Sequence, residues 1–462
     1  MLKDRCSQFK LLTQKIADTD FTGYTFQYPP LLSWKDKISD AGILKGWAQT
    51  LKSDPRHFGI YIHIPYCKQK CTYCRYFSIE IKNVKAELGA YLAALKIEIS
   101  LYLRVLSAAS VHSLYFGGGT PSLISLEQID DIFGFLYNSL NFGKCKQVVF
   151  EGNPDFLDFE KIKLLKRHGV NRLTIGVQSL DAKVISSVNR YQKRNSFFRC
   201  MEAARKAGIA NINVDLMAGL PNQTKNSFIK TLNTVISFSP EMIHIHPFCP
   251  TFLTPFFREG NRLSAGFINN RQACLGDSGS ILRQHGYRPI KFDAWGKNEA
   301  ARNIQLSDAI EYNSPFLGLG LGALSHATGR LRHVNKINFK KYVFDLKKEK
   351  FPIHSVCRMH RKEEMIYFAV ASLRYGVIDK IKFRKMFKEE LNRVFHKELS
   401  HLSRAGKVKE TPQFVYSLMS DMEEYSVYSK YFYDSRLVKQ AQHARVGYKS
   451  EINKQYSEHI YF

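Results

Sequence analysis

Three cysteines that lie close together are the residues of this sequence best suited to chemistry. Cys67, Cys71 and Cys74 follow the spacing C-x3-C-x2-C. Thiolates grouped in this way can hold a [4Fe–4S] cluster, which normally takes four cysteine ligands. With only three, one iron keeps a position for a ligand that is not protein, as a catalytic zinc does. The spacing therefore predicts a cluster that does chemistry rather than one that only supports the fold.

Two other interpretations of these cysteines stay open. A structural zinc would take a fourth Cys or His at similar spacing, and His63 is near but lies in an apolar run typical of a strand. A disulfide needs an oxidising compartment, whereas the first residues lack the apolar core of a secretory signal. We therefore expect a reduced, cytoplasmic setting.

Composition limits the class of protein. The chain has 462 residues, of which 44% are hydrophobic and 24% charged, as in a globular protein. No apolar run approaches the roughly 18 residues of a membrane-spanning helix, so no membrane span is expected. The 68 Lys and Arg against 41 Asp and Glu give a net charge of +27. A solvated basic surface, an acidic small substrate or nucleic acid could each explain it, but no RNA-binding signature accompanies the charge, and nucleic acid is not expected.

Strand and helix patterns alternate from about residue 59. Strands are expected at 60–64, 113–116, 147–151, 173–177, 212–217 and 242–246, with a seventh at 288–293. Helices are expected at 84–106, 126–140, 159–168, 195–207 and 225–237. Such repeats require parallel strands joined by helical crossovers. Six units predict an α/β fold with a partial (β/α)6 TIM-like barrel, in which chemistry gathers at the carboxyl ends of the strands.

Four regions are expected along the chain. They are an N-terminal arm at 1–55, the barrel at 56–300, a connection and substrate-side region at 301–350, and a mostly helical C-terminal domain at 351–462. In the last region, helices are expected at 361–373 and 380–402, and 399–417 has the pattern of a winged-helix end.

The cysteine motif resembles that of the radical S-adenosylmethionine (SAM) superfamily, whose barrel type the strand pattern also fits. Within it, residues from about 24 to 417 are most similar to the oxygen-independent coproporphyrinogen III oxidase-like family. Tyr73 stands where the family has an aromatic residue before the last cysteine, which implies that it contacts the cofactors. The resemblance implies that Cys67, Cys71 and Cys74 hold a [4Fe–4S] cluster and that SAM binds its fourth iron. One electron would then cleave SAM to a 5′-deoxyadenosyl radical that abstracts a hydrogen atom from the substrate.

Further motifs resemble the SAM-binding segments of that family. Gly118, Gly119 and Thr120, in a Gly-Gly-Gly-Thr-Pro run, match the segment that binds the amino end of SAM. Single matches at or near expected strand ends imply further SAM contacts by Tyr61, Glu151, Gln178, Arg190 and Asp215. Arg190 would face the SAM carboxylate, since a guanidinium fork suits a carboxylate. Each of these residues alone also has an ordinary structural explanation.

The resemblance fails at three places that bear on the substrate. Tyr76 stands where the oxidases carry a fourth cysteine, and Asp293-Ala294-Trp295-Gly296 lacks the histidine of their Asp-His-Phe-Ala stretch. The haem motif of the chaperone relatives has a partial counterpart in 332–335 with Tyr342, but no matching Trp. His333 in that segment could bind haem or substrate, or make an ordinary polar contact.

Three functions remain open from the sequence. The first is an enzyme of haem metabolism acting on a tetrapyrrole, by oxidative decarboxylation of coproporphyrinogen III or a related step, with an electron donor such as flavodoxin or ferredoxin. The second is a class C radical SAM methyltransferase or cyclopropane-forming enzyme that binds a second SAM. The third is a haem-binding chaperone without turnover. Release of carbon dioxide, formation of S-adenosylhomocysteine, and haem binding alone would distinguish them.

Overall fold

The computed structural model describes residues 28–53, 57–107, 109–193, 195–250, 254–261, 264–419, 422–437 and 439–440. About half of the predicted N-terminal arm, residues 1–27, lies outside this part of the chain. The chain divides into two compact units, one formed by residues 38–354 and one by residues before 38 together with those from 355 onward.

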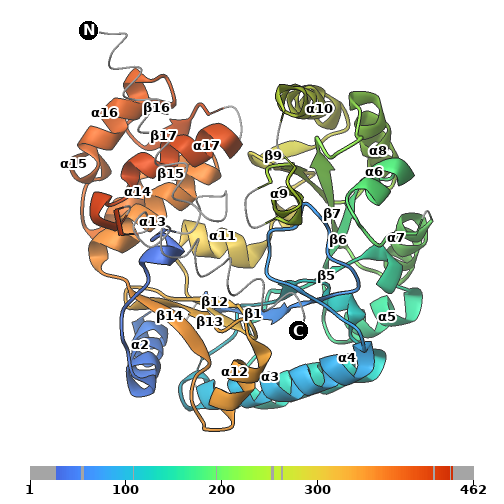
Figure 1. Ribbon diagram of the computed structural model, residues 1–462. Coiled ribbons are helices and arrows are strands. Elements are labelled where there is room, and N and C mark those ends of the chain that lie inside the picture. The colour runs from blue at the N-terminus through green and yellow to red at the C-terminus, as the bar shows by residue number, and fades with distance from the viewer. Residues whose placement is uncertain are drawn as a thin grey trace. The chain divides into compact units, whose positions relative to one another are not determined.

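A parallel sheet forms the centre of the larger unit (Figure 1). Six neighbouring strands run parallel in chain order: β1 (Gly59–Ile64), β4 (Ser113–Gly118), β5 (Gln147–Gly152), β6 (Arg172–Gln178), β7 (Asn211–Ala218) and β8 (Met242–Pro247). The sheet and its crossovers confirm the predicted (β/α)6 architecture.

Helices follow these strands; five of them lie close to the predicted positions, whereas α6 was not predicted. They are α3 (Val84–Leu106), α4 (Leu126–Ser139), α5 (Phe159–Arg167), α6 (Ala182–Ser187), α7 (Ser196–Lys206) and α8 (Lys225–Ser237). Ser125 and Gln128 form a capping box at the start of α4. Gly169 and Gly208, just beyond α5 and α7, take φ of 82° and 76°, which glycine adopts without strain.

The sheet extends beyond the six units on both sides. Next to β1 lie β11 (Phe316–Leu319), β12 (Leu324–Ala327), β13 (Leu331–Asn335) and β14 (Ile353–Arg358), of which β11 is parallel to β1. Next to β8 lie β10 (Ala294–Gly296) and β9 (Arg288–Lys291), both antiparallel to their neighbours. The seventh predicted strand, 288–293, was therefore wrong in part. Its segment ends at Lys291 and pairs with β10 as a hairpin, because the few residues between them are too short for a parallel crossover.

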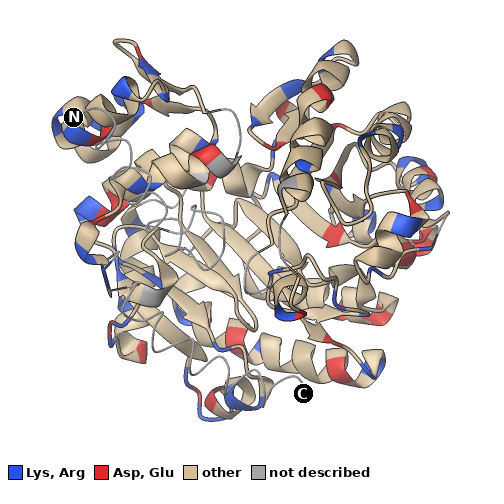
Figure 2. Ribbon diagram, turned by 45° about the horizontal axis from the view of Figure 1, so that its top comes forward, with Lys and Arg blue, Asp and Glu red and all other residues tan. Residues whose placement is uncertain are grey.

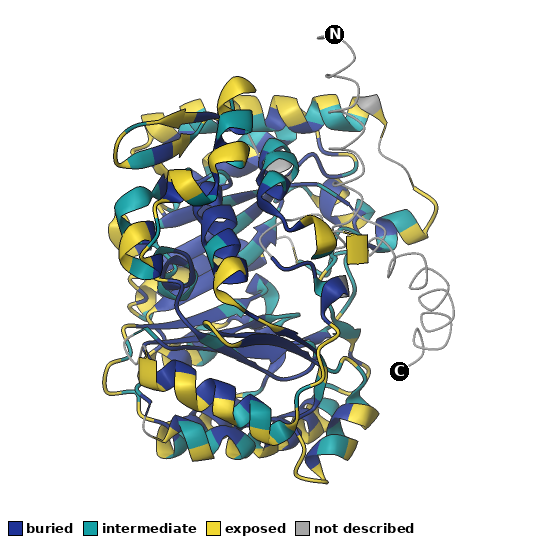
Figure 3. Ribbon diagram, turned by 90° about the vertical axis from the view of Figure 1, so that its left-hand side faces the viewer, coloured by how far each residue is buried: buried dark blue, intermediate teal, exposed yellow. Residues whose placement is uncertain are grey.

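The remaining helices of this unit are α2 (Asp40–Ser53), α9 (Pro255–Arg258), α10 (Ala265–Gln284), α11 (Ile304–Glu311) and α12 (Phe339–Leu346). Short 3-10 turns lie at Pro121–Leu123, Pro154–Phe156 and Glu299–Ala301. Figure 3 shows strands that are largely buried and helices that are buried on one side only. In Figure 2, Lys, Arg, Asp and Glu colour the helices and loops far more than the strands.

The smaller unit is mostly helical. It contains a 3-10 turn at Leu31–Ser33, then α13 (Arg361–Arg374), β15 (Val377–Asp379), α14 (Lys380–Phe387), α15 (Leu391–Val394), α16 (His396–Arg404), β16 (Val408–Glu410), β17 (Phe414–Ser417), α17 (Met422–Tyr428) and a 3-10 turn at Ser429–Phe432. Strands β15, β17 and β16 form an antiparallel sheet. The element order α16–β16–β17 follows the predicted winged-helix pattern.

The single helix predicted over 380–402 was wrong, because the structure has three helices there. Lys388, directly after α14, takes a left-handed conformation with φ of 52°. Glu390 is extended and begins α15. No helix in the described part of the chain is long and apolar enough to cross a membrane.

One buried carboxyl group joins several elements of the larger unit. Glu98, on α3, is fully buried. It accepts hydrogen bonds from the backbone N–H of Gly320 at 2.7 Å, Asn335 Nδ2 at 2.6 Å and Tyr342 Oη at 2.5 Å. Burial raises the pKa of Glu98 to about 7, although these hydrogen bonds act in the opposite direction. A single side chain therefore connects α3 to the loop after β11, to β13 and to α12.

Stability should depend on the protonation of Glu98. Because its pKa is about 7 in the folded chain and 4.5 ordinarily, the folded state holds a proton that the unfolded state releases between these values. The stabilisation is complete below pH 4.5 and is lost as pH rises to 7. We expect the free energy of unfolding, relative to Glu98→Gln, to fall by about 3 kcal/mol over this window and then level off. Urea unfolding of the metal-free protein measures it, with Ser100→Ala on the exposed part of α3 as control. A difference that stays constant with pH would contradict the assignment.

Candidate active site

The three cysteines lie on a short excursion that follows β1. Cys67 ends β2 (Tyr66–Cys67), which pairs in parallel with β3 (Ile79–Glu80), and Cys71 and Cys74 lie in the loop between them. Thr72 anchors this loop at two points: its N–H donates to Val188 O at 2.9 Å, and its carbonyl accepts from the N–H of Phe256 at 3.0 Å. The loop is thus tied to the ends of two barrel segments that lie far away in the sequence.

The side chain of Lys70 links the start of the same loop to its end. Its Nζ donates to the carbonyl of Tyr76 and to Ser78 Oγ, both at 2.6 Å. Its carbonyl accepts from Asn189 Nδ2 at 2.9 Å. Tyr76, at the position where the oxidases carry a fourth cysteine, is 54% exposed. The loop therefore reaches its conformation through Lys70 rather than through a thiol at position 76.

The surroundings of Cys67 disfavour a free thiolate. All three cysteines are half-buried and unbridged. Burial raises the pKa of the Cys67 thiol to about 11, with the charge of Cys74 adding to the effect. Thr120 Oγ1 acts in the other direction by donating to Cys67 Sγ at 3.4 Å. A bound iron centre would be needed to hold the Cys67 thiol as a thiolate at neutral pH.

Arg190 joins the cysteine loop to β6. Its Nη1 donates to Tyr73 Oη at 3.0 Å and lies 4.0 Å from Cys71 Sγ. Its Nη2 donates to the carbonyl of Gly176, and its Nε to Gln192 Oε1 at 2.9 Å. Hydrogen bonds from all three guanidinium nitrogens thus fix its plane beside the Cys71 thiol.

The glycine run after β4 lies against the same loop. A Cβ on Gly119 would lie 2.7 Å from the carbonyl oxygen of Tyr66, which real side chains do not tolerate. Gly118 takes φ of 113°, and a Cβ there would lie 2.8 Å from the His63 ring. The backbone here therefore approaches the cysteine loop as only glycine allows.

Aromatic and acidic side chains line the neighbouring strands, with Tyr61 and Tyr115 paired in mid-strand and Glu151 near the end of β5. Tyr115 Oη donates to Glu151, and the Tyr115 ring lies 5.6 Å from that of Tyr61. Tyr61 Oη lies 3.2 Å from His63 Nδ1. Burial raises the pKa of Glu151 to about 7, and the charge of Asp215 raises it further against the Tyr115 hydrogen bond. Two carboxyl groups therefore influence each other across the barrel interior.

Gln178 and Asp215 complete the predicted set. Gln178 ends β6 in a left-handed conformation with φ of 67°, at an irregularity in the pairing with β7. Such strain in a residue other than glycine is typical of functional sites. Asp215, on β7, accepts from Asn213 Nδ2 at 2.7 Å. The predicted residues thus lie at or near the carboxyl ends of five parallel strands and on the loops that follow them.

The sequence reasoning missed a polar group on β8. His244 Nδ1 lies 3.7 Å from Asp215 Oδ1, and its Nε2 lies 3.0 Å from Asp293 Oδ2. Lys291 Nζ lies 3.1 Å from Asp293 Oδ1. The ring of His246 lies 3.8 Å from that of His244, and burial, aided by the charge of His244, lowers the pKa of His246 to about 3. The alternation Ile-His-Ile-His in a predicted strand was the available signal, since it places both imidazoles on one face.

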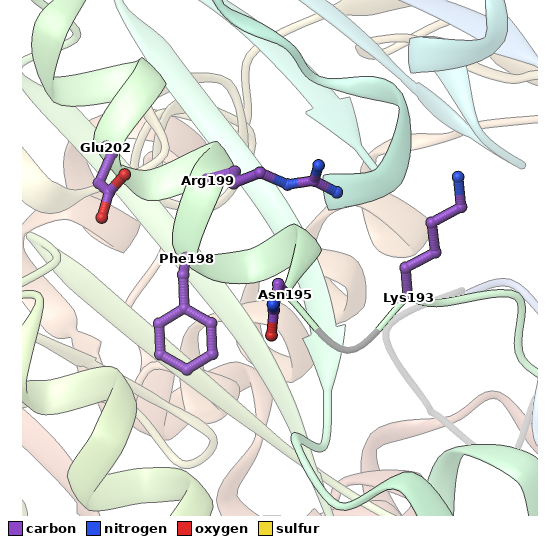
Figure 4. A pocket seen from close by; sticks show the side chains of 5 residues that line it. All are labelled: Lys193, Asn195, Phe198, Arg199 and Glu202. Atoms are coloured by element: carbon purple, nitrogen blue, oxygen red, sulfur yellow. The ribbon is translucent and has the colours of Figure 1, made fainter.

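A hollow beside α7 belongs to a different part of the surface. It is lined by Lys193, Asn195, Phe198, Arg199 and Glu202 (Figure 4). None of the predicted site residues lines it.

Comparisons with known proteins agree with the geometry. Residues 61–235 match the model of the radical SAM superfamily. The chain is 27% identical over 364 residues to the haem chaperone HemW of Bacillus subtilis, covering 77% of this chain and 94% of that protein. It is 25% identical over 311 residues to the oxygen-independent coproporphyrinogen III oxidase of Escherichia coli, covering 64% of this chain and 67% of that one. The solved structure of coproporphyrinogen III oxidase (HemN) from Escherichia coli, described as a radical SAM enzyme, superposes with a TM-score of 0.77. It covers 88% of this chain and 96% of that one at 21% identity, which shows the fold.

Removing the Lys70 ammonium group should loosen the cysteine loop. Lys70→Met loses two hydrogen bonds from a charged donor, each contributing more than about 1 kcal/mol. We expect backbone amides in 71–77 to exchange with deuterium at least roughly tenfold faster, because tenfold corresponds to about 1.4 kcal/mol of local opening. Lys68→Met, an exposed lysine of the same loop, is the matched control. Equal exchange in the two variants would show that the Lys70 hydrogen bonds do not hold the loop.

Proposed function

We propose that this chain, which belongs to the radical SAM superfamily and to its oxygen-independent coproporphyrinogen III oxidase-like family, is an enzyme that acts on a tetrapyrrole. Its cofactors are a [4Fe–4S] cluster and SAM. Together, when bound, they supply a 5′-deoxyadenosyl radical that abstracts a hydrogen atom. The observation that carries the proposal is the loop after β1, which carries three unbridged thiols and brings that of Cys71 to 4.0 Å from the Arg190 guanidinium.

Each residue of the site has a role in the proposal. Cys67, Cys71 and Cys74 hold the cluster. Gly118, Gly119 and Thr120 receive the amino end of SAM. Arg190 holds its carboxylate, for which a fixed guanidinium is suited.

The other side chains complete the SAM site. Tyr61, Glu151, Gln178 and Asp215 line the rest of the SAM molecule, and Tyr73 positions Arg190 through the contact described above. Asp215 suits the hydroxyl groups of the ribose, because an ionised carboxylate accepts two hydrogen bonds at once. The half-buried Tyr61 and Glu151 side chains would help to keep water away from a reactive carbon radical.

Coproporphyrinogen III is the substrate we propose first. Several relatives of the chain carry the name oxygen-independent coproporphyrinogen III oxidase. The net charge of +27 suits a substrate with four carboxylates. A small electron-transfer protein such as flavodoxin or ferredoxin would supply the electron.

The chaperone alternative is weakened by how its haem motif is used. His333 is fully buried, and its Nε2 accepts a hydrogen bond from Trp47 Nε1 at 3.3 Å. Asn335 and Tyr342 both donate to Glu98. These side chains support packing inside the larger unit, so they do not form an open haem ligand set.

A methyltransferase or cyclopropane-forming enzyme is the second candidate. The exposed Tyr76 in place of the fourth cysteine favours it, because class C enzymes of the superfamily also lack that cysteine. A second SAM would then be the methyl donor.

The decisive experiment is anaerobic reconstitution with iron and sulfide, followed by incubation with SAM, dithionite and coproporphyrinogen III. We expect 5′-deoxyadenosine together with decarboxylated porphyrinogen in mass spectra. Cys71→Ala should abolish both and lose the cluster absorbance, whereas Cys145→Ala, another half-buried thiol, should retain them.

Other outcomes separate the alternatives. S-adenosylhomocysteine with unchanged porphyrinogen would favour the methyltransferase. Haem binding without SAM cleavage would favour the chaperone. A Cys71→Ala protein that still formed 5′-deoxyadenosine would refute the cluster assignment.

Thr120 should tune the reduction potential of the cluster. Hydrogen bonds to ligand sulfurs stabilise the reduced, more negative state. Thr120→Val keeps the shape but loses the bond to Cys67 Sγ, so we expect a potential about 20–60 mV more negative, equivalent to about 0.5–1.5 kcal/mol. Thr120→Ser should stay near the wild-type value. A redox titration followed by electron paramagnetic resonance measures both, and equal shifts in the two variants would exclude the hydroxyl as the cause.

A further inference from the structure

We propose that His57, His112 and Asp308 bind a divalent transition-metal ion of the zinc class at the amino-terminal end of the barrel strands. This site is separate from the cysteine loop and does not rest on the function proposed above. It uses no cysteine, and its ligands come from three segments of the chain.

The separations of the ligand atoms carry the proposal. Asp308 Oδ2 lies 3.5 Å from His57 Nδ1 and 3.3 Å from His112 Nε2, and the three ligand atoms lie within 4.8 Å of one another. Direct hydrogen bonds between charged partners are shorter, about 2.7–2.9 Å. Zinc at 2.0–2.2 Å from tetrahedral N and O ligands separates those ligands by about 3.3–3.5 Å. The two separations that involve Asp308 therefore match those of ligand atoms sharing a zinc ion.

The second group of this kind in the described part of the chain has a different geometry. Asp215 Oδ1 lies 3.7 Å from His244 Nδ1 and 4.0 Å from His246 Nε2, which is wider than a tetrahedral edge. His244 Nε2 is engaged at 3.0 Å with Asp293. That group includes Asp215 of the proposed SAM site. The contacts that join Asp215, His244, Asp293 and Lys291 account for its arrangement.

The three ligands lie where a bound metal ion would stabilise the fold. His57 lies just before β1 and His112 just before β4, two strands that pair in parallel from Gly59 and Ser113. Asp308 comes from α11, about 200 residues later in the chain. The amino-terminal face of a barrel is where side chains serve stability rather than catalysis. The ion would therefore act as a structural clamp between two strands and α11.

The chemistry of the donors fits a borderline metal. Two imidazoles and one carboxylate are a typical set for zinc and its first-row neighbours. The His112 and Asp308 side chains are 8% and 11% exposed, and that of His57 is 23% exposed. The Tyr312 ring stacks on His57 at 4.5 Å and 15°. A fourth, water ligand can reach the ion from the His57 side.

Cobalt(II) is the probe that tests the site, because its visible spectrum reports both geometry and ligand type. The full-length Cys67→Ala/Cys71→Ala/Cys74→Ala protein, which carries no cluster, is titrated with Co²⁺ and competed with Zn²⁺. We expect one equivalent to bind with tetrahedral or five-coordinate visible bands and without a sulfur-to-cobalt charge-transfer band. Zn²⁺ should also raise the melting temperature, because it binds the folded state.

Three variants decide the origin of the signal. His57→Asn and Asp308→Asn should each weaken Co²⁺ binding at least tenfold and remove the Zn²⁺ shift in melting temperature. His168→Asn removes a different histidine–aspartate pair, in which Nε2 lies 2.6 Å from Asp130 Oδ1, and should bind like the parent. If Asp308→Asn fails to fold, His57→Asn carries the test, because its side chain is the most exposed of the three. No binding by the parent, or equal binding by His57→Asn, would overturn the proposal.

Discussion

The parallel pairing of the barrel strands is the constraint on which the site depends. Parallel strands place all their carboxyl ends at one edge of the sheet, and the register holds Tyr61 opposite Tyr115 and Glu151 opposite Thr174. Residues from Cys67 to Asp215 are thereby brought from across 150 residues of sequence to neighbouring strand ends and loops. The same pairing gathers His57 and His112 at the opposite edge. Each end of the strand set thus collects its own group of side chains.

Burial then determines the electrostatics of the site. Desolvation raises the pKa of Glu151 and lowers that of His246, so both groups favour their neutral forms. The Arg190 guanidinium keeps its charge and is fixed by three acceptors. An anionic ligand such as a SAM carboxylate would therefore meet an oriented cation in a site of low dielectric.

The departures from the family pattern have physical consequences. With Tyr76 turned to solvent, the loop after the third cysteine is held by the ammonium group of Lys70. The segment that corresponds to a haem motif instead supports the buried Glu98. Asn335 and Tyr342, which correspond to residues of a haem motif in relatives, therefore stabilise the packing of this chain.

Local patterns were sufficient for much of the fold and the site. The bounds of α3 and α8 match the predicted ranges, because their apolar spacing and capping residues act over a few residues only. The six parallel strands and the cysteine spacing could likewise be read from the sequence. The break at Lys388 and the hairpin of β9 and β10 could not, since a left-handed residue and an antiparallel edge depend on tertiary contacts.

The sequence by itself determined which residues could ligate iron, and that strands and helices alternate in the order of a β/α barrel. Only the tertiary structure decided that Arg190 lies beside Cys71, that His244 lies between Asp215 and Asp293, and that Asp308 meets His57 and His112. The physical reason is the distance along the sequence over which each kind of interaction acts. Spacing and periodicity reflect the geometry of one element, whereas these contacts join elements up to about 250 residues apart, whose approach is set by strand register and burial.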